Sequence, residues 1–250
     1  MNREIVAARL RAAGCVAADE EAACMLATTR DADTLEAWLR HRADGVPLAW
    51  ITGWTIFCGA RMHVAPGVYV PRVQTEALAR RAARVLPRSG VAIDLCTGAG
   101  AVAAYLGRAV TGARVIGIDC DPSAARCARD NGVTAVVGDL AAAVQRPQSV
   151  DMVTAVAPYV PTSALPLLPA DARRHEPRIA FDGGPDGLDV VRRVVDDAAR
   201  VLRPGGWLMV EIGGTQDEAL APELGAGGFA GVTAWRDADG DLRGMAARRT

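Results

Sequence analysis

The 250-residue sequence lacks lysine, long apolar runs and an excess of either charge. All 28 basic residues are arginine, which we attribute to the codon bias of a GC-rich genome and not to phosphate recognition. The formal net charge of -1 gives no electrostatic footprint for a nucleic acid or a membrane surface. No apolar stretch approaches the roughly 18 residues of a membrane-spanning helix, and no apolar signal-peptide core follows the first residues. We therefore expect a cytoplasmic protein with no nucleic-acid and no membrane partner.

The six cysteines also lack the spacing of a metal site or of a disulfide framework. There is no Cys-x-x-Cys pair, and no histidine stands at metal-ligand spacing from a cysteine. We therefore expect reduced thiols and no bound metal. Half of the residues are apolar, which is ample material for one large α/β domain with a small appendage.

Three segments are expected along the chain. Residues 1–50 place apolar residues among charges at helical spacing, with a break between helices at Asp31–Thr34, and predict a small helical N-terminal domain. Residues 51–75 change to short β-rich pieces around glycines, which predicts a β-hairpin linker. Residues 76–250 form the third and largest segment.

Strands and helices alternate in this third segment, which favours a doubly wound, mainly parallel α/β sheet. The end differs, because residues 232–235 and 242–248 flank a turn-forming stretch and predict an antiparallel hairpin. A seven-stranded Rossmann-like sheet closed in this way resembles the class I S-adenosylmethionine-dependent methyltransferases. The other predicted strands lie near 91–95, 114–118, 133–137, 151–156 and 207–212. The predicted helices lie near 76–86, 101–109, 122–130, 140–145 and 187–202.

Residues 91–119 have the pattern of a nucleotide-binding βαβ unit. A strand leads into the turn Cys96-Thr97-Gly98-Ala99-Gly100, and a helix then joins a second strand that ends on Asp119. The two glycines let the backbone pass close to a ligand, and the helix directs its N–H groups there. An acid about 20 residues further on can bind a ribose diol, which is the role that we predict for Asp119.

Two cofactors fit this turn. Gly98–Ala103 satisfies the pattern G-x-G-x-x-A, so NAD is one alternative. Two further acids favour S-adenosyl-L-methionine. Asp139 follows the third strand, where an adenine edge would lie in a methyltransferase fold, although it could equally cap a helix. Asp94 places a carboxylate where a pyrophosphate would be repelled and an ammonium accepted. We predict S-adenosyl-L-methionine as the cofactor, and we interpret Asp121 as a helix cap.

Several motifs in the same order make the chain resemble the protein-(glutamine-N5) methyltransferase family, over most of residues 43–250. Members of this family methylate the glutamine of peptide-chain release factors. The resemblance implies this activity, a release factor as partner, and an N-terminal domain that recognises the substrate. The motifs are Gly45–Gly53, Val70–Glu76, Cys96–Gly100, Glu176–Arg178, Asp182–Leu188 and Pro204–Gly206.

The catalytic segment implied by the resemblance is Val156-Ala157-Pro158-Tyr159, where the family carries Asn-Pro-Pro-Tyr. In the family, the Asn oxygen and the next backbone carbonyl each accept a hydrogen from the substrate NH2, which turns the nitrogen lone pair toward the methyl group. Val156 has no side-chain acceptor, whereas Ala157 keeps its carbonyl. One lost contact of this kind costs about 1 to 3 kcal/mol, or roughly one to two decades in rate.

The resemblance implies further residues on both sides of this segment. Tyr159 is either a wall of the acceptor pocket or an aromatic filler after a turn. The other substrate-side residues either line the acceptor pocket or cap the following helix. The implied substrate-binding residues are Arg72, Thr75, Glu76 and Tyr159. The implied cofactor-binding residues are Asp94, Cys96, Thr97, Gly98, Ala99, Gly100, Asp119, Cys120, Asp139, Leu140 and Val156.

Three hypotheses for the activity follow. The first is an S-adenosylmethionine-dependent N-methyltransferase that acts on a release-factor-like glutamine amide. The second keeps the enzyme and changes the acceptor to a small molecule or another protein that needs no Asn at position 156. The third is a protein that binds the cofactor and has lost catalysis.

Overall fold

The computed structural model describes residues 1–250, and its N-terminal part is a helical bundle of α1 (Arg3–Ala12), α2 (Ala18–Thr28), α3 (Ala32–Ala43) and α4 (Leu48–Thr52). Apolar side chains of α1, α2 and α3 form one buried cluster. The break predicted at Asp31–Thr34 lies earlier, at Thr29–Asp31. Its physical reason is that Asp31 is the N-cap of α3 and accepts a hydrogen bond from the Thr34 amide at 2.7 Å.

A β-hairpin follows the bundle, as the glycine-rich pattern predicted. Strands β1 (Trp54–Phe57) and β2 (Ala60–His63) pair antiparallel, with Phe57 opposite Ala60. The two turn residues, Cys58 and Gly59, both have positive φ, at 49° and 75°. This backbone matches the twist of the paired strands and explains the short loop.

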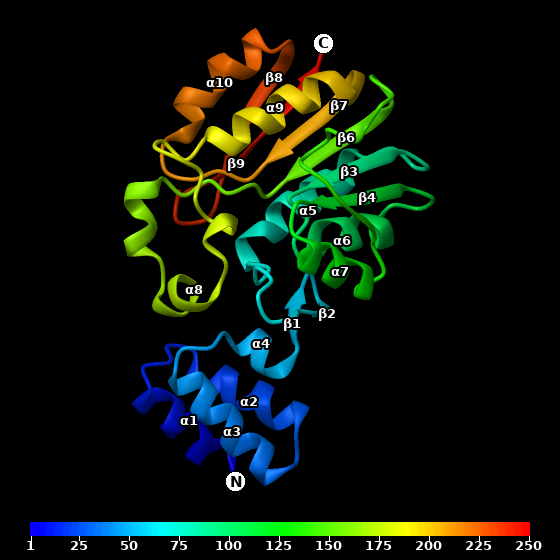
Figure 1. Ribbon diagram of the computed structural model, residues 1–250. Coiled ribbons are helices and arrows are strands. Elements are labelled where there is room, and N and C mark those ends of the chain that lie inside the picture. Colours follow the sequence, from blue (N-terminus) through cyan, green and yellow to red (C-terminus); the bar gives the residue numbers. More distant parts are fainter.

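The larger part of the molecule is built on a seven-stranded sheet with the order β5-β4-β3-β6-β7-β9-β8 (Figure 1). Strands β3 to β7 pair in parallel, and β9 pairs antiparallel with both β7 and β8. The fold class predicted from the sequence is therefore confirmed. The strands are β3 (Val91–Leu95), β4 (Arg114–Asp119), β5 (Thr134–Val137), β6 (Val150–Ala155), β7 (Leu202–Val210), β8 (Phe229–Arg236) and β9 (Leu242–Arg249).

Helices cover both faces of this sheet (Figure 1). Alternate residues of each strand point to opposite faces. Ile93 and Val153 belong to the core shared with α9 and α10, whereas Ala92 and Met152 belong to the core shared with α5 and α6. The covering helices are α5 (Glu76–Val85), α6 (Ala101–Ala109), α7 (Pro122–Asp130), α9 (Asp189–Val201) and α10 (Gln216–Ala226). The shorter ones are η1 (Val73–Thr75), η2 (Thr162–Leu167), α8 (Ala170–His175) and η3 (Arg178–Ala180).

The helix predicted at 140–145 is wrong, because this segment forms successive turns. Its backbone makes only turn bonds of its own, such as the Val144 amide to the Ala141 carbonyl at 2.9 Å, and other backbone groups bond to side chains of α9. The Ala141 amide donates to Asp197 Oδ2 at 2.8 Å, and Arg200 donates to the carbonyls of Ala141 and Val144 at 2.6 and 2.7 Å. Leu140 itself has a positive φ of 47°, which a helix does not admit.

Two other elements also differ from the prediction. The strand expected at 207–212 is β7, which spans Leu202–Val210 and leaves Glu211 and Ile212 beyond its end. Its register shifts between the pairs Val150–Leu202 and Met152–Trp207. The segment Pro204–Gly206 therefore forms a bulge-like irregularity within β7. Helix α10 was not predicted.

The order in which strands are added to the sheet reverses between β3 and β6. From β3 the chain proceeds outward to β4 and β5, and it then returns to place β6 on the other side of β3. In an open parallel sheet, ligands bind outside the carboxyl ends of the strands at such a point. The ends of β3 and β6 are therefore where a site is to be sought. The structure has no helix with the length and apolar character needed to cross a membrane.

Candidate active site

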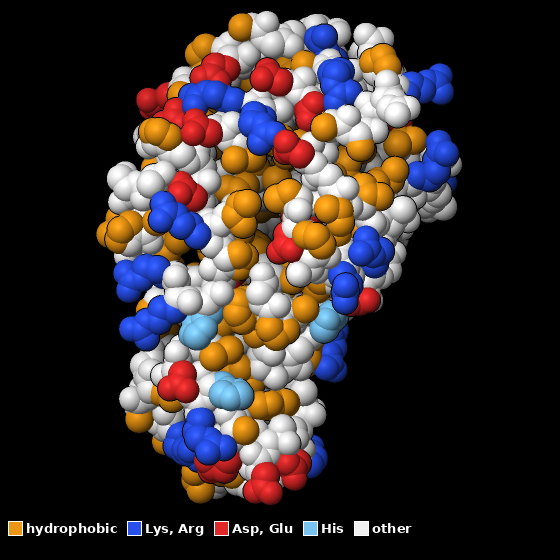
Figure 2. Space-filling view, in the orientation of Figure 1, with side chains coloured by type: hydrophobic (Ala, Val, Ile, Leu, Met, Phe, Trp, Pro, Cys, Tyr) orange, Lys and Arg blue, Asp and Glu red, His pale blue; other side chains and the backbone are white.

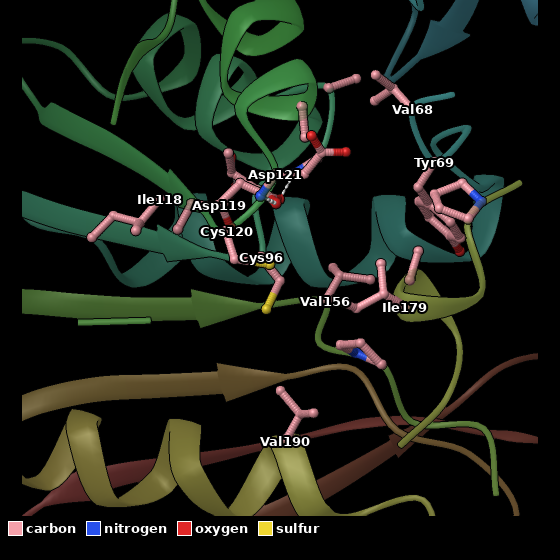
Figure 3. Close-up of a pocket in the computed structure, with 18 of the residues that line it drawn as sticks. Val68, Tyr69, Cys96, Ile118, Asp119, Cys120, Asp121, Val156, Ile179 and Val190 are labelled. Atoms are coloured by element: carbon pink, nitrogen blue, oxygen red, sulfur yellow. Dashed lines mark hydrogen bonds between the residues drawn. The ribbon is translucent and has the colours of Figure 1, made fainter. Parts of the chain in front are cut away.

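A cavity of about 200 Å³ opens at the carboxyl ends of β3, β4 and β6. Figure 2 shows apolar side chains gathered around a hollow in the middle of this face, and Figure 3 shows residues that line the cavity. All of the predicted cofactor residues except Gly100 line it. The structure therefore brings together the ends of three strands and the turns that follow them, which the sequence pattern had linked to one ligand.

The two glycines of the turn have different tasks. Gly98 has φ +56°, and a side chain there would meet no atom within 4 Å, so its backbone borders open space in the cavity. Gly100 has φ +81°, and a Cβ there would lie 2.9 Å from Val133 and 3.0 Å from Ala128. Gly98 thus lets a ligand approach the backbone, whereas Gly100 lets α6 pack closely against α7 and the residues before β5.

Asp119 orders the turn that it faces. Its Oδ2 accepts a hydrogen bond from the Gly98 amide at 2.8 Å, and its Oδ1 accepts one from the Asp121 amide at 2.9 Å. Burial raises the pKa of Asp119, and these amide bonds oppose that rise. Each carboxylate oxygen has a second lone pair, so Asp119 can still accept hydrogens from a ligand hydroxyl.

Asp94 is a buried carboxylate at the floor of the same cavity. It is 2% exposed, and it accepts hydrogen bonds from the hydroxyls of Thr97 at 2.6 Å and Thr154 at 2.7 Å. Burial raises the pKa of Asp94 to about 6, although both hydroxyls act in the opposite direction. A cation placed in the cavity would therefore favour the charged form of this side chain.

The acids at the mouth of the cavity have structural partners. Asp121 accepts a hydrogen bond from the Ser123 amide at 2.8 Å and caps α7, whose first residue is Pro122, as interpreted from the sequence. Asp139 binds Arg193 of α9 at 2.6 Å and caps no helix. Burial raises the pKa of the cavity thiols Cys96 and Cys120, so both are held as neutral thiols.

A second cavity, of about 250 Å³, adjoins the first. The residues that line both are Tyr69, Val156 and Ala180. Val156 lies beside Ile179 in the first cavity (Figure 3). Ala157 is buried, and its carbonyl accepts no hydrogen bond from the protein. The segment after β6 therefore offers unpaired backbone carbonyls, including that of Ala157 beside the second cavity, and no polar side chain at position 156.

The other predicted catalytic and substrate residues line one cavity or the other, with the exception of Glu76. Pro158 and Thr75 line the first cavity, and Tyr159 and Arg72 line the second. Glu76 lines neither, because its carboxylate accepts a hydrogen bond from the Cys58 amide at 2.6 Å and binds Arg80 at 2.8 Å. Glu76 thus ties the β-hairpin to α5.

Arg72 is held in place by its neighbours. It forms an ion pair with buried Glu176 and lies 4.9 Å above the centre of the Tyr69 ring. Glu176 also accepts a hydrogen bond from the Val70 amide at 2.9 Å. Two motifs that are about a hundred residues apart in the sequence, at 70–76 and 176–178, therefore meet beside the second cavity, and the first of them contributes Arg72 and Gln74 to its lining.

Sequence reasoning missed several residues that shape the site. Glu211 is 1% exposed and accepts a hydrogen bond from the Tyr159 hydroxyl at 2.9 Å. Tyr69 lines both cavities, and Arg193 forms an ion pair with Asp139. Tyr69 lies within two residues of a recognised motif, which is a signal that could have been used. Glu211 and Arg193 carry no local signal.

Comparison with known proteins identifies the family. A methyltransferase domain family matches residues 92–175. The chain is 36% identical to the release factor glutamine methyltransferase of Geobacter sulfurreducens over 83% of this chain and 75% of that protein. It is 38% identical to the 4-amino-L-phenylalanine/4-methylamino-L-phenylalanine methyltransferase of Streptomyces pristinaespiralis, over 72% of this chain and 65% of that protein.

A solved structure shares the fold. A 16S rRNA methyltransferase from T. thermophilus, in complex with AdoMet and guanosine, superposes with a TM-score of 0.53 at 17% identity, over 79% of this chain and 44% of that one. Together with the cavity at the switch point, these likenesses place the chain among S-adenosyl-L-methionine-dependent methyltransferases. Within that group, it belongs to the release factor glutamine methyltransferase family.

Proposed function

We propose that this protein methylates the side-chain amide nitrogen of a release-factor-like glutamine. The observation that carries the proposal is the pair of adjoining cavities that meet at Val156, next to the free Ala157 carbonyl. The first cavity would hold S-adenosyl-L-methionine and the second the acceptor side chain. Methyl transfer requires the two ligands to meet in line, and the two-cavity arrangement supports such an approach.

The residues of the first cavity suit S-adenosyl-L-methionine. The open backbone at Gly98 leaves room for a ligand, and Asp119 has acceptor capacity for a ribose diol. Asp94 would face the ammonium of the methionine part. When bound, the cofactor supplies an electrophilic methyl group on a sulfonium. The protein would contribute binding and orientation, because this transfer needs no covalent enzyme intermediate.

The acceptor side retains one of two groups that orient an amide. The Ala157 carbonyl would accept one hydrogen of the substrate NH2, and the second hydrogen would find no partner at Val156. The loss costs about 1 to 3 kcal/mol if it falls on the transition state. We therefore expect slow but measurable methylation of a glutamine amide.

Exposed apolar side chains beside the acceptor cavity support a protein as acceptor. Val73 is 76% exposed, Leu167 84% and Ile179 65%. Val73 and Leu167 each adjoin a residue of the second cavity, and Ile179 lines the first. Apolar side chains gathered on a surface often mark protein contacts. A release factor would meet these residues as its glutamine enters, and the enzyme would then act in the cytoplasm.

A small-molecule amine is the second candidate acceptor. An amine nitrogen has a free lone pair, so it does not need the second acceptor that Val156 lacks. The second cavity is largely apolar, with Tyr69, Phe181 and Leu168 in its lining. The relative from Streptomyces pristinaespiralis is named for an aromatic amine of this kind.

The test is transfer of a labelled methyl group from S-adenosyl-L-methionine to purified release factors of the same host and, separately, to 4-amino-L-phenylalanine. Label on the release-factor glutamine supports the first proposal. Label only on the amine supports the second. We would conclude that catalysis has been lost if the protein binds the cofactor tightly and labels neither the release factors, nor the amine, nor any extract fraction of the host.

A further inference from the structure

Tyr159 is anchored at both of its polar ends by side chains that follow β7. Its hydroxyl donates to Glu211 Oε1 at 2.9 Å. Its backbone carbonyl accepts a hydrogen bond from Gln216 Nε2 at 2.8 Å. Tyr159 lines the second cavity, whereas Glu211 and Gln216 line neither. Among the residues to which Glu211 and Gln216 hydrogen-bond, Tyr159 is the one that lines the second cavity.

Glu211 is an unusual choice for a packing position. It is 1% exposed, it forms no ion pair, and its Oε2 has no hydrogen-bond partner. Burial raises its pKa, while the neighbouring hydroxyls of Thr75 and Tyr159 lower it. Arg243 and Arg72 also lower this pKa, but neither forms an ion pair with the carboxylate. A buried carboxylate without a paired cation is unfavourable, and an apolar side chain of similar size would pack there more favourably. The Tyr159 hydroxyl donates the one hydrogen bond that this carboxylate accepts from a side chain, and the Thr75 hydroxyl lies close by without such a bond.

The backbone fixes where Glu211 stands. Its amide donates to the Ala155 carbonyl at 3.0 Å, which continues the pairing with the last residue of β6 one residue beyond the end of β7. Ala155 directly precedes the catalytic segment. The end of β6 therefore positions both Glu211 and Tyr159. The hydrogen bond between their side chains connects the carboxylate to the acceptor cavity.

Gln216 fastens the other end of Tyr159 to two further loops. Its Oε1 accepts a hydrogen bond from the Gly213 amide at 2.9 Å, and its Nε2 also donates to the Asp186 carbonyl at 3.0 Å. Gly187 makes this arrangement feasible, because a Cβ there would lie 2.3 Å from the Tyr159 carbonyl and 2.4 Å from Gln216 Nε2. Its φ of +79° also favours glycine.

We propose that Glu211 and Gln216 are positioning residues that set the Tyr159 ring as a fixed wall against the methyl acceptor. The proposal rests on the proposed function, because it assigns the second cavity to the acceptor. A fixed aromatic wall is of special use here, since Val156 gives no polar contact to orient the acceptor. Cofactor binding should not depend on the pair, because none of the three residues lines the first cavity.

The kinetic test is a double-substitution cycle with Tyr159→Phe and Glu211→Leu. Each single change should lower kcat/KM for the methylated acceptor about tenfold, and the double variant should be no worse than either. The dissociation constant of S-adenosyl-L-methionine should stay within twofold. Glu211→Gln should restore most of the activity, because its side-chain oxygen still accepts the Tyr159 hydrogen. Additive losses, or failure of Glu211→Gln in a folded protein, would overturn the assignment.

Asp151→Asn is the matched control. Asp151 is also a buried carboxylate of this sheet, but it lies at the opposite end of β6, where it accepts a hydrogen bond from the Val91 amide at 2.7 Å and pairs with Arg203. Its replacement should lower stability without changing kcat/KM in the remaining folded protein. An equal loss of kcat/KM in this variant would show that general destabilisation explains the effect.

A second measurement does not depend on any acceptor. The chain has three tyrosines, so the ring signals of carbon-13-labelled tyrosine can be assigned with Tyr159→Phe. Glu211→Leu should shift and broaden the Tyr159 ring signals, whereas Asp151→Asn should leave them in place. Unchanged Tyr159 signals in Glu211→Leu would refute the positioning pair. Shifted signals with no labelled acceptor would instead refute the proposed function and leave the pair standing.

Discussion

Asp119 accepts a hydrogen bond from the Gly98 amide at 2.8 Å, across the ends of β4 and β3. The same carboxylate that can hold a ribose diol thus also sets the conformation of the glycine turn beneath it. Asp119→Ala should therefore weaken S-adenosyl-L-methionine binding twice over, by about 2 to 3 kcal/mol or roughly 30- to 100-fold in Kd. Isothermal titration calorimetry of the purified variant measures this loss.

Asp130→Ala is the control for this prediction. Asp130 is an exposed carboxylate at the end of α7 and lines neither cavity. It should leave the Kd unchanged. Equal affinities of wild type and Asp119→Ala for the cofactor would show that Asp119 neither binds the ribose nor sets a turn conformation that binding requires.

The raised pKa of Asp94 predicts how the free energy of unfolding depends on pH. Burial raises its pKa to about 6 in the folded protein, whereas its unfolded value is 3.8. The folded state then binds more protons than the unfolded state between these values, so this group makes stability fall as pH rises from about 4 to 6. The fall is on the order of 3 kcal/mol. Urea unfolding of wild type and Asp94→Asn across this range should show a slope that the variant lacks.

Cofactor binding should show the opposite trend. The ammonium of S-adenosyl-L-methionine interacts favourably with the charged form of Asp94, so affinity should rise as pH increases through about 6. The Asn variant should bind with a weaker and nearly pH-independent Kd. An Asp94→Asn protein that keeps the full pH dependence would assign the titration to another group.

The parts of the site that could be predicted from the sequence are those in which neighbours along the chain also act together. The turn from Cys96 to Gly100 and the acid at Asp119 are read from one short stretch, because a strand, a glycine turn and a helix are dictated locally. The parallel sheet follows from the alternation of strands and helices. The closing hairpin of β8 and β9 follows from its turn residues.

The parts that could not be predicted depend on contacts between distant segments. Nothing near Leu140 reveals that its neighbours bond to α9, so the apolar run 140–145 looks helical. Glu211 meets Tyr159 only because β7 lies beside β6 and because the carboxylate is buried, while 52 residues separate the two in the chain. Local patterns contain no information about such pairs.

The N-terminal bundle offers a test of buried against exposed ion pairs. Arg42 of α3 binds Glu21 of α2 at 2.7 and 3.1 Å, and both side chains are 12% exposed. Glu21→Ala leaves a buried guanidinium with only the Val46 carbonyl at 3.5 Å and Asp171 at 3.8 Å, and should destabilise the protein by about 3 kcal/mol. Tryptophan fluorescence during urea unfolding follows the change, since Trp38 lies in α3.

Asp19→Ala is the matched control in the same bundle. Asp19 pairs with Arg11, and both side chains are more than half exposed. Its removal should change the free energy of unfolding by less than about 1 kcal/mol. A loss from Asp19→Ala as large as that from Glu21→Ala would mean that burial does not set the strength of these pairs.

Val156 provides the sharpest test of the acceptor chemistry. The side chain lies where the two cavities meet, next to the free Ala157 carbonyl, and it offers no hydrogen-bond acceptor. Val156→Asn restores an amide oxygen there and should raise methylation of a release-factor glutamine by roughly 10- to 100-fold, which corresponds to about 1 to 3 kcal/mol. Initial rates with labelled S-adenosyl-L-methionine measure the gain.

The comparison with Val156→Leu separates polarity from shape. Leucine changes the volume at this position without adding an acceptor, so it should not raise glutamine methylation. If the natural acceptor is an amine, the Asn variant should gain little on that substrate or lose activity, because an amine needs no second acceptor and Asn introduces a polar group that must be satisfied in a largely apolar pocket. A rate on glutamine that is the same for Val, Asn and Leu would mean that position 156 does not tune the amide, and the Ala157 carbonyl would then be the acceptor that orients it.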